Sequence, residues 1–277
     1  MGAGVHTPIM CELLGICANL AVTATLSLDV LARHGGATGP HKDGWGIGYY
    51  QGPATRLLKE AEAAADSEWL RFVRDHELRS PIILSHIRKA TRGDLTLANT
   101  QPFQRELGGH MHLFAHNGNL AGIDALAAVP NRFRPVGETD SEIAFCELMR
   151  RLALLWDDAE SVPPLQHRYE IVTAFAREIA PMGPANFLYS DGDALFAHGN
   201  RRTQATTGEI RPPGLYWLSR QCGVESEFGV DGLRLSGGSV VVTLVASVPL
   251  SDEPWQPLDE GEVLCLRAGA LACWRVD

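Results

Sequence analysis

Residues 8–20 read PIMCELLGICANL and place a Met-Cys pair, Met10 and Cys11, directly ahead of an apolar run. The run is short and apolar, which predicts a buried β-strand. A free cysteine is most often a small buried apolar residue, so Cys11 by itself indicates no chemistry. The segment in front of it, residues 1–10, shows no clear pattern. The reason for a cysteine at this junction has to come from the rest of the chain.

Composition narrows the class of protein. The chain has 277 residues, of which 45% are hydrophobic and 21% charged, as in ordinary globular domains. A net charge of -9 excludes the basic footprint of a nucleic-acid-binding protein. No apolar run is long enough to span a bilayer, and residues 1–10 lack the features of a secretory signal. The six cysteines are scattered without a CxxC pair. We therefore expect a cytoplasmic protein with reduced thiols and no nucleic-acid or membrane partner.

Strands and helices are predicted along the whole chain. The expected strands are GWGIGYY, PIILSHI, MHLFAH, LYWLS, SVVVTLVAS, EVLCLRAG and LACWRV. The expected helices cover residues 25–36, 66–78, 139–156 and 169–180. Thr139 and Glu142 have the spacing of a capping box, and Asp191-Gly192 is typical of a hairpin. Hairpins in place of regular βαβ alternation indicate an α+β fold.

Two polar segments follow predicted strands. SHIRKATRG (residues 85–93) places Arg88 in a loop, where a guanidinium can hold a carboxylate through two parallel hydrogen bonds. The alternative is a solvated basic turn. FAHNGNL (residues 114–120) leaves its strand at Asn117 and Gly118. A side-chain amide and an unobstructed backbone N–H at this point can form an oxyanion hole, although Asn-Gly is also the commonest hairpin signal.

Two further segments carry candidate binding groups. GETDSE (residues 137–142) places Asp140 in the first turn of a helix, where it can cap the helix or receive an ammonium group. PHKDGWGIG (residues 40–48) concentrates glycine before a strand, which permits tight turns and the close approach of a ligand. It contains no phosphate-loop motif, and an ordinary turn is the simpler interpretation.

Three histidines, His110, His112 and His116, alternate along one strand and therefore share a face. Such a pattern can bind a metal ion, which leaves a metal-dependent hydrolase as an alternative function. No acidic ligand follows at close range in the sequence.

Taken in order, the Met-Cys pair, HxRxATxG, HNG and ETDSE resemble the glutaminase domain of class II glutamine amidotransferases, which are N-terminal nucleophile hydrolases. The motifs cover residues 10–150. GGATGPHKDGWGI, NTQPF and FRPVGETDSE are similar to the compact, stand-alone YafJ-like branch, which extends the resemblance over most of the chain. The resemblance implies a four-layer αββα sandwich that forms a single domain over residues 11–277.

The resemblance also implies catalytic roles. Cys11 is expected to be the nucleophile and its own α-amino group the base, since an α-amine has a pKa of about 7.7–8.0. That role requires Cys11 to be the first residue. We therefore expect residues 1–10 to be a leader that is absent from the active form: either Met10 is the true start and is removed after synthesis, or residues 1–10 are cleaved. Asn117 and Gly118 are expected to form the oxyanion hole.

Substrate contacts follow from the same resemblance. Arg88 corresponds to the arginine that holds the α-carboxylate, and Asp140 to the carboxylate that holds the α-ammonium group. Arg33, Gly44 and Trp45 are expected to line the pocket. The chain departs from the aminosugar-forming relatives at Lys89 and Arg92, where they have Trp and His.

The expected function is hydrolysis of the γ-amide of glutamine or of a related γ-glutamyl compound through a thioester on Cys11, without a cofactor. Because no synthetase domain follows, the chain is either a free-standing amidohydrolase or a subunit that feeds ammonia to a partner synthetase. A non-catalytic γ-glutamyl-binding sensor is a third interpretation.

Overall fold

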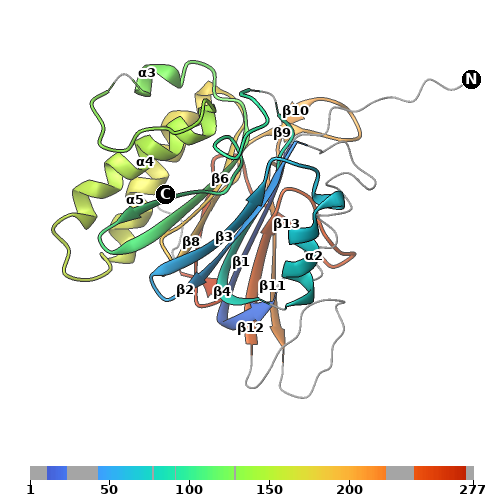
Figure 1. The fold of residues 1–277 in the computed structure, drawn as a ribbon. Coiled ribbons are helices and arrows are strands. Elements are labelled where there is room, and N and C mark those ends of the chain that lie inside the picture. The colour runs from blue at the N-terminus through green and yellow to red at the C-terminus, as the bar shows by residue number, and fades with distance from the viewer. Residues whose placement is uncertain are drawn as a thin grey trace, which may run out of the picture.

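The structure is a computed structural model that describes residues 11–23, 43–76, 78–90, 92–127, 129–222 and 240–272. Two antiparallel sheets lie face to face between layers of helices (Figure 1). The helices are α2 (Glu68–Asp75), α3 (Asp124–Ala127), α4 (Asp140–Trp156) and α5 (Leu165–Ile179), with 3₁₀ turns η2 (Ala64–Asp66) and η3 (Ala180–Met182). Helices α4 and α5 cover one sheet and α2 covers the other, which is the expected αββα sandwich.

The first sheet has seven strands in the order β13-β11-β12-β1-β4-β2-β3. They are β1 (Glu12–Thr23), β2 (Trp45–Gln51), β3 (Ala54–Glu60), β4 (Arg79–Ile87), β11 (Tyr216–Cys222), β12 (Val240–Ala246) and β13 (Gln256–Pro257). Strand β1 is central, because it pairs with β12 on one side and with β4 on the other. Both of its faces are covered, which explains why its sequence is a continuous apolar run.

The second sheet has six strands in the order β15-β14-β8-β7-β6-β5. They are β5 (Phe103–Leu107), β6 (His110–Gly118), β7 (Ala185–Ser190), β8 (Leu195–His198), β14 (Val263–Arg267) and β15 (Ala270–Leu271). A separate two-stranded pair is formed by β9 (Arg202–Thr203) and β10 (Ile210–Arg211). The predicted turn at Asp191-Gly192 connects β7 to β8 and confirms that hairpin.

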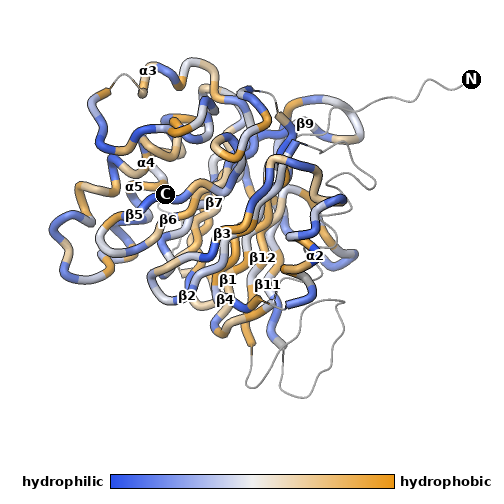
Figure 2. The backbone as a smooth tube through the Cα atoms, in the orientation of Figure 1, coloured by the Kyte–Doolittle hydropathy of each residue, from blue (hydrophilic) through white to orange (hydrophobic). Residues whose placement is uncertain are grey.

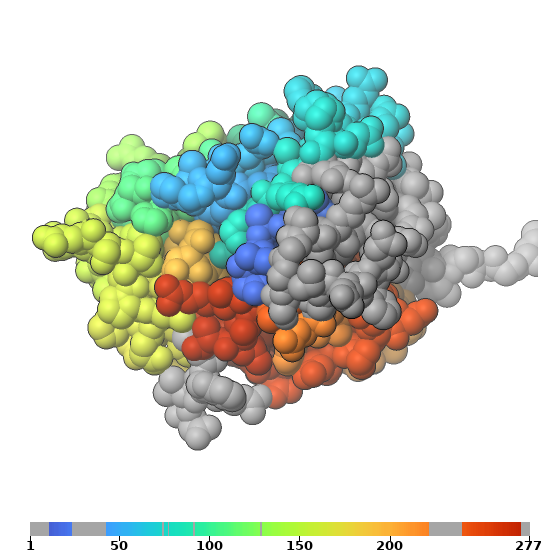
Figure 3. All heavy atoms as spheres, turned by 90° about the horizontal axis from the view of Figure 1, so that it is seen from below, coloured from blue at the N-terminus to red at the C-terminus, as the bar shows by residue number. Residues whose placement is uncertain are grey.

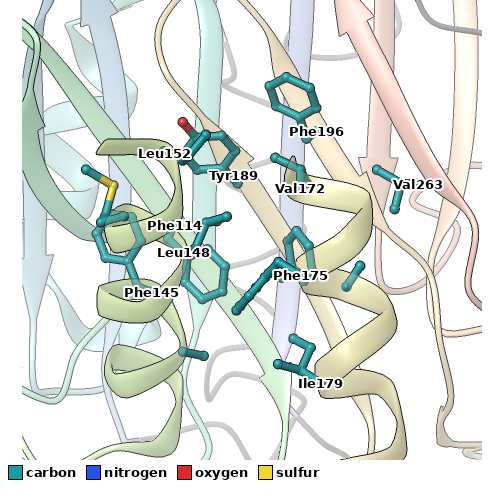
Figure 4. Packing of buried hydrophobic residues seen from close by; sticks show 14 of the residues in the cluster. Phe114, Phe145, Leu148, Leu152, Val172, Phe175, Ile179, Tyr189, Phe196 and Val263 are labelled. Carbon is teal, nitrogen blue, oxygen red and sulfur yellow. The ribbon is translucent and has the colours of Figure 1, made fainter. Parts of the chain in front are cut away.

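Three apolar layers hold the sandwich together, and Figure 2 shows hydrophobic colour concentrated along the interior strands. The layer between the sheets includes Leu13, Cys17 and Leu113. The layer under α4 and α5 contains stacked aromatic rings, among them Phe114 and Phe145 with centroids 5.3 Å apart (Figure 4). Seen from below, α4 and α5 lie at one end of the molecule and α2 at the other, with strands between them (Figure 3).

Helix α4 begins as the sequence predicts, with one difference. Thr139 is the N-cap, and its side-chain oxygen accepts a hydrogen bond from the Glu142 N–H. The reciprocal half of a capping box is missing, because the Glu142 carboxylate accepts the Gly137 N–H and pairs with Arg105. The buried Glu142 therefore fixes the loop before the helix. In a capping box its carboxylate would instead accept the backbone N–H of the N-cap residue, Thr139.

The predicted strands and helices are largely confirmed, with differences at their ends. Helix α5 starts at Leu165, four residues before the predicted start, and LACWRV contributes only its first residue to β15 within the described part of the chain. The predicted helix over residues 25–36 lies outside the described residues. None of the helices that the structure describes is long and apolar enough to cross a membrane.

Candidate active site

The ends of several strands meet at one end of the sandwich. In the register of β1 and β4, Glu12 lies opposite Ile87, so the residue before β1 adjoins the residues after β4. Alternate residues of a strand face the same side. Leu13 and Cys17 face the layer between the sheets, as do Leu113 and Ala115 of β6. The same alternation directs Cys11 and Asn117 into that space from opposite sheets.

The Cys11 thiol is half-buried and bound by one residue of the neighbouring segment. The Lys89 N–H donates to Cys11 Sγ over 3.1 Å, and the thiol donates to the Lys89 carbonyl over 3.2 Å. Burial raises the pKa of the Cys11 thiol to about 11, although the Lys89 N–H and the positive charge of Arg88 act in the opposite direction. With Cys11 nitrogen in a peptide bond, the thiol is therefore neutral near pH 7.

Asn117 joins the two sheets at this end. Its side chain is fully buried, and its Nδ2 donates to the Cys11 carbonyl and, over 3.3 Å, to the Ser247 hydroxyl. Both amide hydrogens thus have acceptors, while Asn117 Oδ1 has no partner among the described residues. The hairpin alternative is wrong at this position, because Asn117 and Gly118 pair with Asn186 and Ala185 in β7.

Gly118 is fixed by close approach to the neighbouring backbone. A Cβ atom at this position would lie 1.7 Å from the Pro184 carbonyl oxygen, so that no other residue fits. His116, the residue before Asn117, is bonded on its backbone N–H and carbonyl by the Gln101 side chain. Gln101 belongs to the NTQPF motif, which thereby supports the strand that carries Asn117.

Arg88 lies beside Cys11 but faces its own loop. Its guanidinium donates to the carbonyls of Arg92, Gly93 and Asp94 at 3.0–3.1 Å. Burial lowers its pKa, and the Cys11 thiol and Asp43 are close enough to affect that pKa. The Arg88 side chain therefore already organises residues 92–94, and contact with a substrate carboxylate stays a prediction.

Asp140, the first residue of α4, contacts the segment that follows Gly118. Its carboxylate accepts the N–H groups of Leu120 and Ser141, at 2.8 and 3.0 Å, so it fixes the chain just beyond Gly118. This arrangement matches the first-turn position predicted from the sequence. Contact of this carboxylate with a substrate ammonium group stays a prediction.

The residues expected to line the pocket lie in different parts of the structure. Gly44 has a φ of +131°, a conformation that favours glycine, and its carbonyl accepts the Arg88 N–H over 2.8 Å. Trp45 is buried in the apolar layer against α2, with its indole N–H donating to Glu60. Trp45 thus packs inside the sheet–helix layer, and its role in the pocket stays a prediction. Arg33 lies outside the described residues.

The histidine face provides no metal site among the described residues. His112 Nδ1 bonds the Tyr189 hydroxyl and its Nε2 the Leu107 carbonyl. His116 is bonded at both ring nitrogens as well, to Ser141 and to Pro184. Burial lowers the pKa of His112 to about 4, so it is a neutral core residue that packs on Trp156. No group of three metal-binding side chains lies within the part of the chain that the structure describes.

Three supporting residues were not predicted from the sequence. Asp43 accepts the Ala90 N–H over 2.8 Å and so fixes the segment next to Cys11. Asn186 and Ser247 each bond Asn117. Asp43 stands in a motif that the sequence singled out, but Asn186 and Ser247 carry no local signal, since each meets Asn117 only through the fold.

Known proteins show the same chain architecture. The family of class II glutamine amidotransferases matches residues 10–276. The chain is 36% identical over 266 residues to "Putative glutamine amidotransferase YafJ" of Escherichia coli (strain K12), which covers 93% of this chain and 98% of that protein. It is 33% identical over 268 residues to a Haemophilus influenzae protein described as "Putative glutamine amidotransferase", covering 94% of this chain and 85% of that protein.

Solved structures agree with this result. A structure described as a "predicted glutamine amidotransferase" from Pseudomonas aeruginosa PA01 has a TM-score of 0.66 and 31% identity, covering 95% of this chain and all of that one. Glutamine phosphoribosylpyrophosphate amidotransferase from B. subtilis has a TM-score of 0.57 at 16% identity, covering 95% of this chain and 48% of that one, a likeness of fold alone. The chain belongs to the class II glutamine amidotransferases.

Proposed function

We propose that the protein hydrolyses the γ-amide of glutamine, or of a related γ-glutamyl compound, with Cys11 as the nucleophile. The observation that carries the proposal is the position of the Cys11 thiol, held by Lys89 beside Arg88 while Asn117 reaches the Cys11 carbonyl from the opposite sheet. A thiol, a cation and a side-chain amide thus meet at one point of the sandwich.

The base in this proposal is the α-amino group of Cys11. A thiol with a pKa near 11 provides few thiolate ions at neutral pH, so attack needs an adjacent proton acceptor. An amide nitrogen cannot serve, whereas a free α-amine titrates at about 7.7–8.0. We therefore propose that the active form begins at Cys11, with residues 1–10 removed or never translated.

The reaction has two steps, formation of the γ-glutamyl thioester and its hydrolysis. The amine takes the thiol proton, the sulfur attacks the γ-carbonyl carbon, and the amine returns the proton to the departing nitrogen, releasing ammonia or an amine. Water then attacks the γ-glutamyl thioester, giving one proton to the amine and leaving glutamate. The C–S bond breaks, and the thiolate recovers that proton.

Asn117 and Gly118 would stabilise the negative oxygen of both tetrahedral intermediates. Since both hydrogens of Asn117 Nδ2 have acceptors, one must be redirected when the oxyanion forms. We expect the hydrogen that the Cys11 carbonyl accepts to be the one redirected, because the contact with Ser247 then keeps the amide in place. The Asn117→Ala variant should lower kcat about 10²–10³-fold with little change in KM. A raised KM at unchanged kcat would make Asn117 a binding residue.

Arg88 and Asp140 would hold the opposite charges of the substrate's amino-acid end. Arg88→Ala should abolish the preference for a γ-glutamyl amide over an analogue that lacks the α-carboxylate, because only the first has a group to pair with Arg88. Equal losses for both analogues would show that Arg88 serves only the loop carbonyls that it bonds in the structure.

Two wider features belong to the same proposal. Residues 11–277 would form a single glutaminase domain, and the ammonia would be either released or passed to a partner synthetase.

The proposal for Cys11 is tested by treating the chain that starts at Met10 with a glutamine-like alkylating analogue and mapping the adduct. Stoichiometric modification of Cys11, with parallel loss of glutamine hydrolysis, is expected. Loss of activity with the adduct on another cysteine would contradict it.

A further inference from the structure

Asn117 is held by two separate sets of hydrogen bonds that end in one short segment. One set runs from its side chain through Ser247, and the other runs from its backbone through Asn186. Both reach residues 200–202, which lie before and within β9. Asn186 and Ser247 lie 69 and 130 positions from Asn117 along the chain, and no local sequence pattern links them to it.

The side-chain connection is buried throughout. The Ser247 hydroxyl accepts from Asn117 Nδ2 over 3.3 Å and from the Leu13 N–H over 3.0 Å. The Ser247 N–H in turn donates to the Leu13 carbonyl over 3.1 Å. The Ser247 carbonyl accepts from the Arg202 guanidinium. Ser247 thereby connects Asn117 to both the start of β1 and Arg202.

The backbone connection runs in parallel. Asn186 Nδ2 donates to the Asn117 carbonyl over 3.1 Å and to the Arg201 carbonyl over 2.8 Å. Its Oδ1 accepts the Asn200 N–H over 2.8 Å. A Cβ atom on Gly214 would lie 1.6 Å from that Oδ1, so the glycine makes room for the Asn186 amide. Asn186 thus fixes the backbone of Asn117 while Ser247 fixes its side chain.

Arg202 is an unusual choice for a support. It is 4% exposed, and burial lowers its pKa, while the nearby Glu12 acts in the opposite direction. A buried guanidinium carries a desolvation cost, so a neutral group would be the cheaper structural donor. Arg202 lies near Glu12, the residue after Cys11, so this buried cation is part of the surroundings of the candidate site.

We propose that Ser247, held by Arg202, is a positioning residue that aims the Asn117 amide at the oxyanion. The proposal rests on the proposed function, since it assigns the group that orients its oxyanion donor. Ser247 keeps one amide hydrogen of Asn117 in place while the other turns from the Cys11 carbonyl to the oxyanion, so the contact with Ser247 is retained in the transition state. Small displacements of such donors reduce catalysis strongly.

The test compares variants of the chain that starts at Met10, with glutamine as substrate. Ser247→Ala should lower kcat about tenfold with KM nearly unchanged, and Ser247→Thr, which retains a hydroxyl, should restore most of it. In an Asn117→Ala background, Ser247→Ala should cause no further loss of kcat. Additive losses, or an unchanged kcat in the single variant, would overturn the proposal.

A matched control separates positioning from stability. Ser80 is another fully buried serine, with hydrogen bonds to the backbone of Tyr50 and Ile82. Ser80→Ala should lower the melting temperature and leave kcat unchanged. An equal drop in kcat from Ser80→Ala would show that Ser247 acts only through stability. Arg202→Lys should lower kcat severalfold at unchanged KM. An unchanged kcat would show that Arg202 has no part in positioning Asn117.

A readout without turnover distinguishes this inference from the proposed function. The side-chain amide resonances of Asn117 should shift in Ser247→Ala and not in Ser80→Ala, whether or not glutamine is the substrate. Failure of Cys11→Ala to abolish turnover would refute the proposed function. An unmoved Asn117 amide in Ser247→Ala would refute the positioning contact itself.

Discussion

Cys11 and Cys17 lie six residues apart, one just before β1 and one within it, and their thiols have similar pKa values but different exposure and different neighbours. Burial raises the pKa of both thiols to about 11. Each sulfur accepts a backbone N–H, from Lys89 at 3.1 Å and from Gly269 at 3.4 Å. Cys17 is fully buried in the layer between the sheets, whereas Cys11 is half-buried at the end of that layer.

The comparison shows that thiol pKa does not identify the nucleophile in this fold. What distinguishes Cys11 is its neighbours: the positive charge of Arg88 acts on its thiol, and the Asn117 amide bonds its carbonyl. The negative charge of Asp193 acts on Cys17 and disfavours its thiolate further. The same strand thus provides one structural cysteine and one candidate nucleophile.

The largest expected difference between the two cysteines is in turnover. Cys11→Ala should abolish glutamine hydrolysis, a loss of roughly 10³-fold or more, because no other group forms the thioester. Cys17→Ala should keep kcat and KM within about twofold, since a buried core thiol contacts no substrate. Steady-state kinetics of both variants provide the measurement. A large kcat loss in Cys17→Ala, with the protein still folded, would break the distinction.

A second difference is expected in labelling by a small alkylating reagent. In the chain that retains residues 1–10, labelling of Cys11 should be slow at pH 7 and speed up about tenfold per pH unit toward pH 11, because the thiolate reacts. Cys17 should stay unlabelled until the protein unfolds. Mass spectrometry of peptides taken over a pH series would resolve the two. Early labelling of Cys17 would show that the layer between the sheets opens in the native state.

The smallest expected effect concerns stability and pH. The Cys17 pKa is about 11 when folded and 9.0 as its reference value, so the folded state keeps its proton where the unfolded state has lost it. This contribution is present in full below pH 9 and is lost as the pH rises through 11. The advantage of wild type over Cys17→Ala should therefore shrink by about 2 kcal/mol between pH 8 and 11. Urea unfolding at each pH measures it, and a constant difference would contradict the shift.

The sequence predicts the central strands better than the edges. Strands β1, β4 and β6 have apolar runs because both sides are covered, and each was predicted. Strand β3, ATRLLKE, was missed: it lies at the sheet edge, is only partly buried, and carries two cations and a glutamate. Strand β5, FQREL, was missed for the same reason, since it pairs only with β6.

The candidate site divides in a similar way. The strand ends bring the motif residues Cys11 and Asn117 into contact, and Asp140 bonds Leu120, three residues beyond Asn117. Ser247 and Asn186 could not be found, because their contacts depend on the register of β12 and β7 rather than on neighbours in the sequence. The hydrogen bonds from the Arg88 guanidinium to carbonyls of its own loop could not be predicted either, because they depend on the conformation of that loop.

The central claim is that Cys11 becomes the nucleophile when its nitrogen is a free amine. The most direct test compares glutamine turnover of the full-length chain and of the chain started at Met10, at equal concentration, with intact mass establishing the first residue of each. The account predicts turnover when Cys11 is terminal and almost none when residues 1–10 are attached to a folded protein. Equal turnover with the leader verifiably intact would contradict the terminal-amine mechanism.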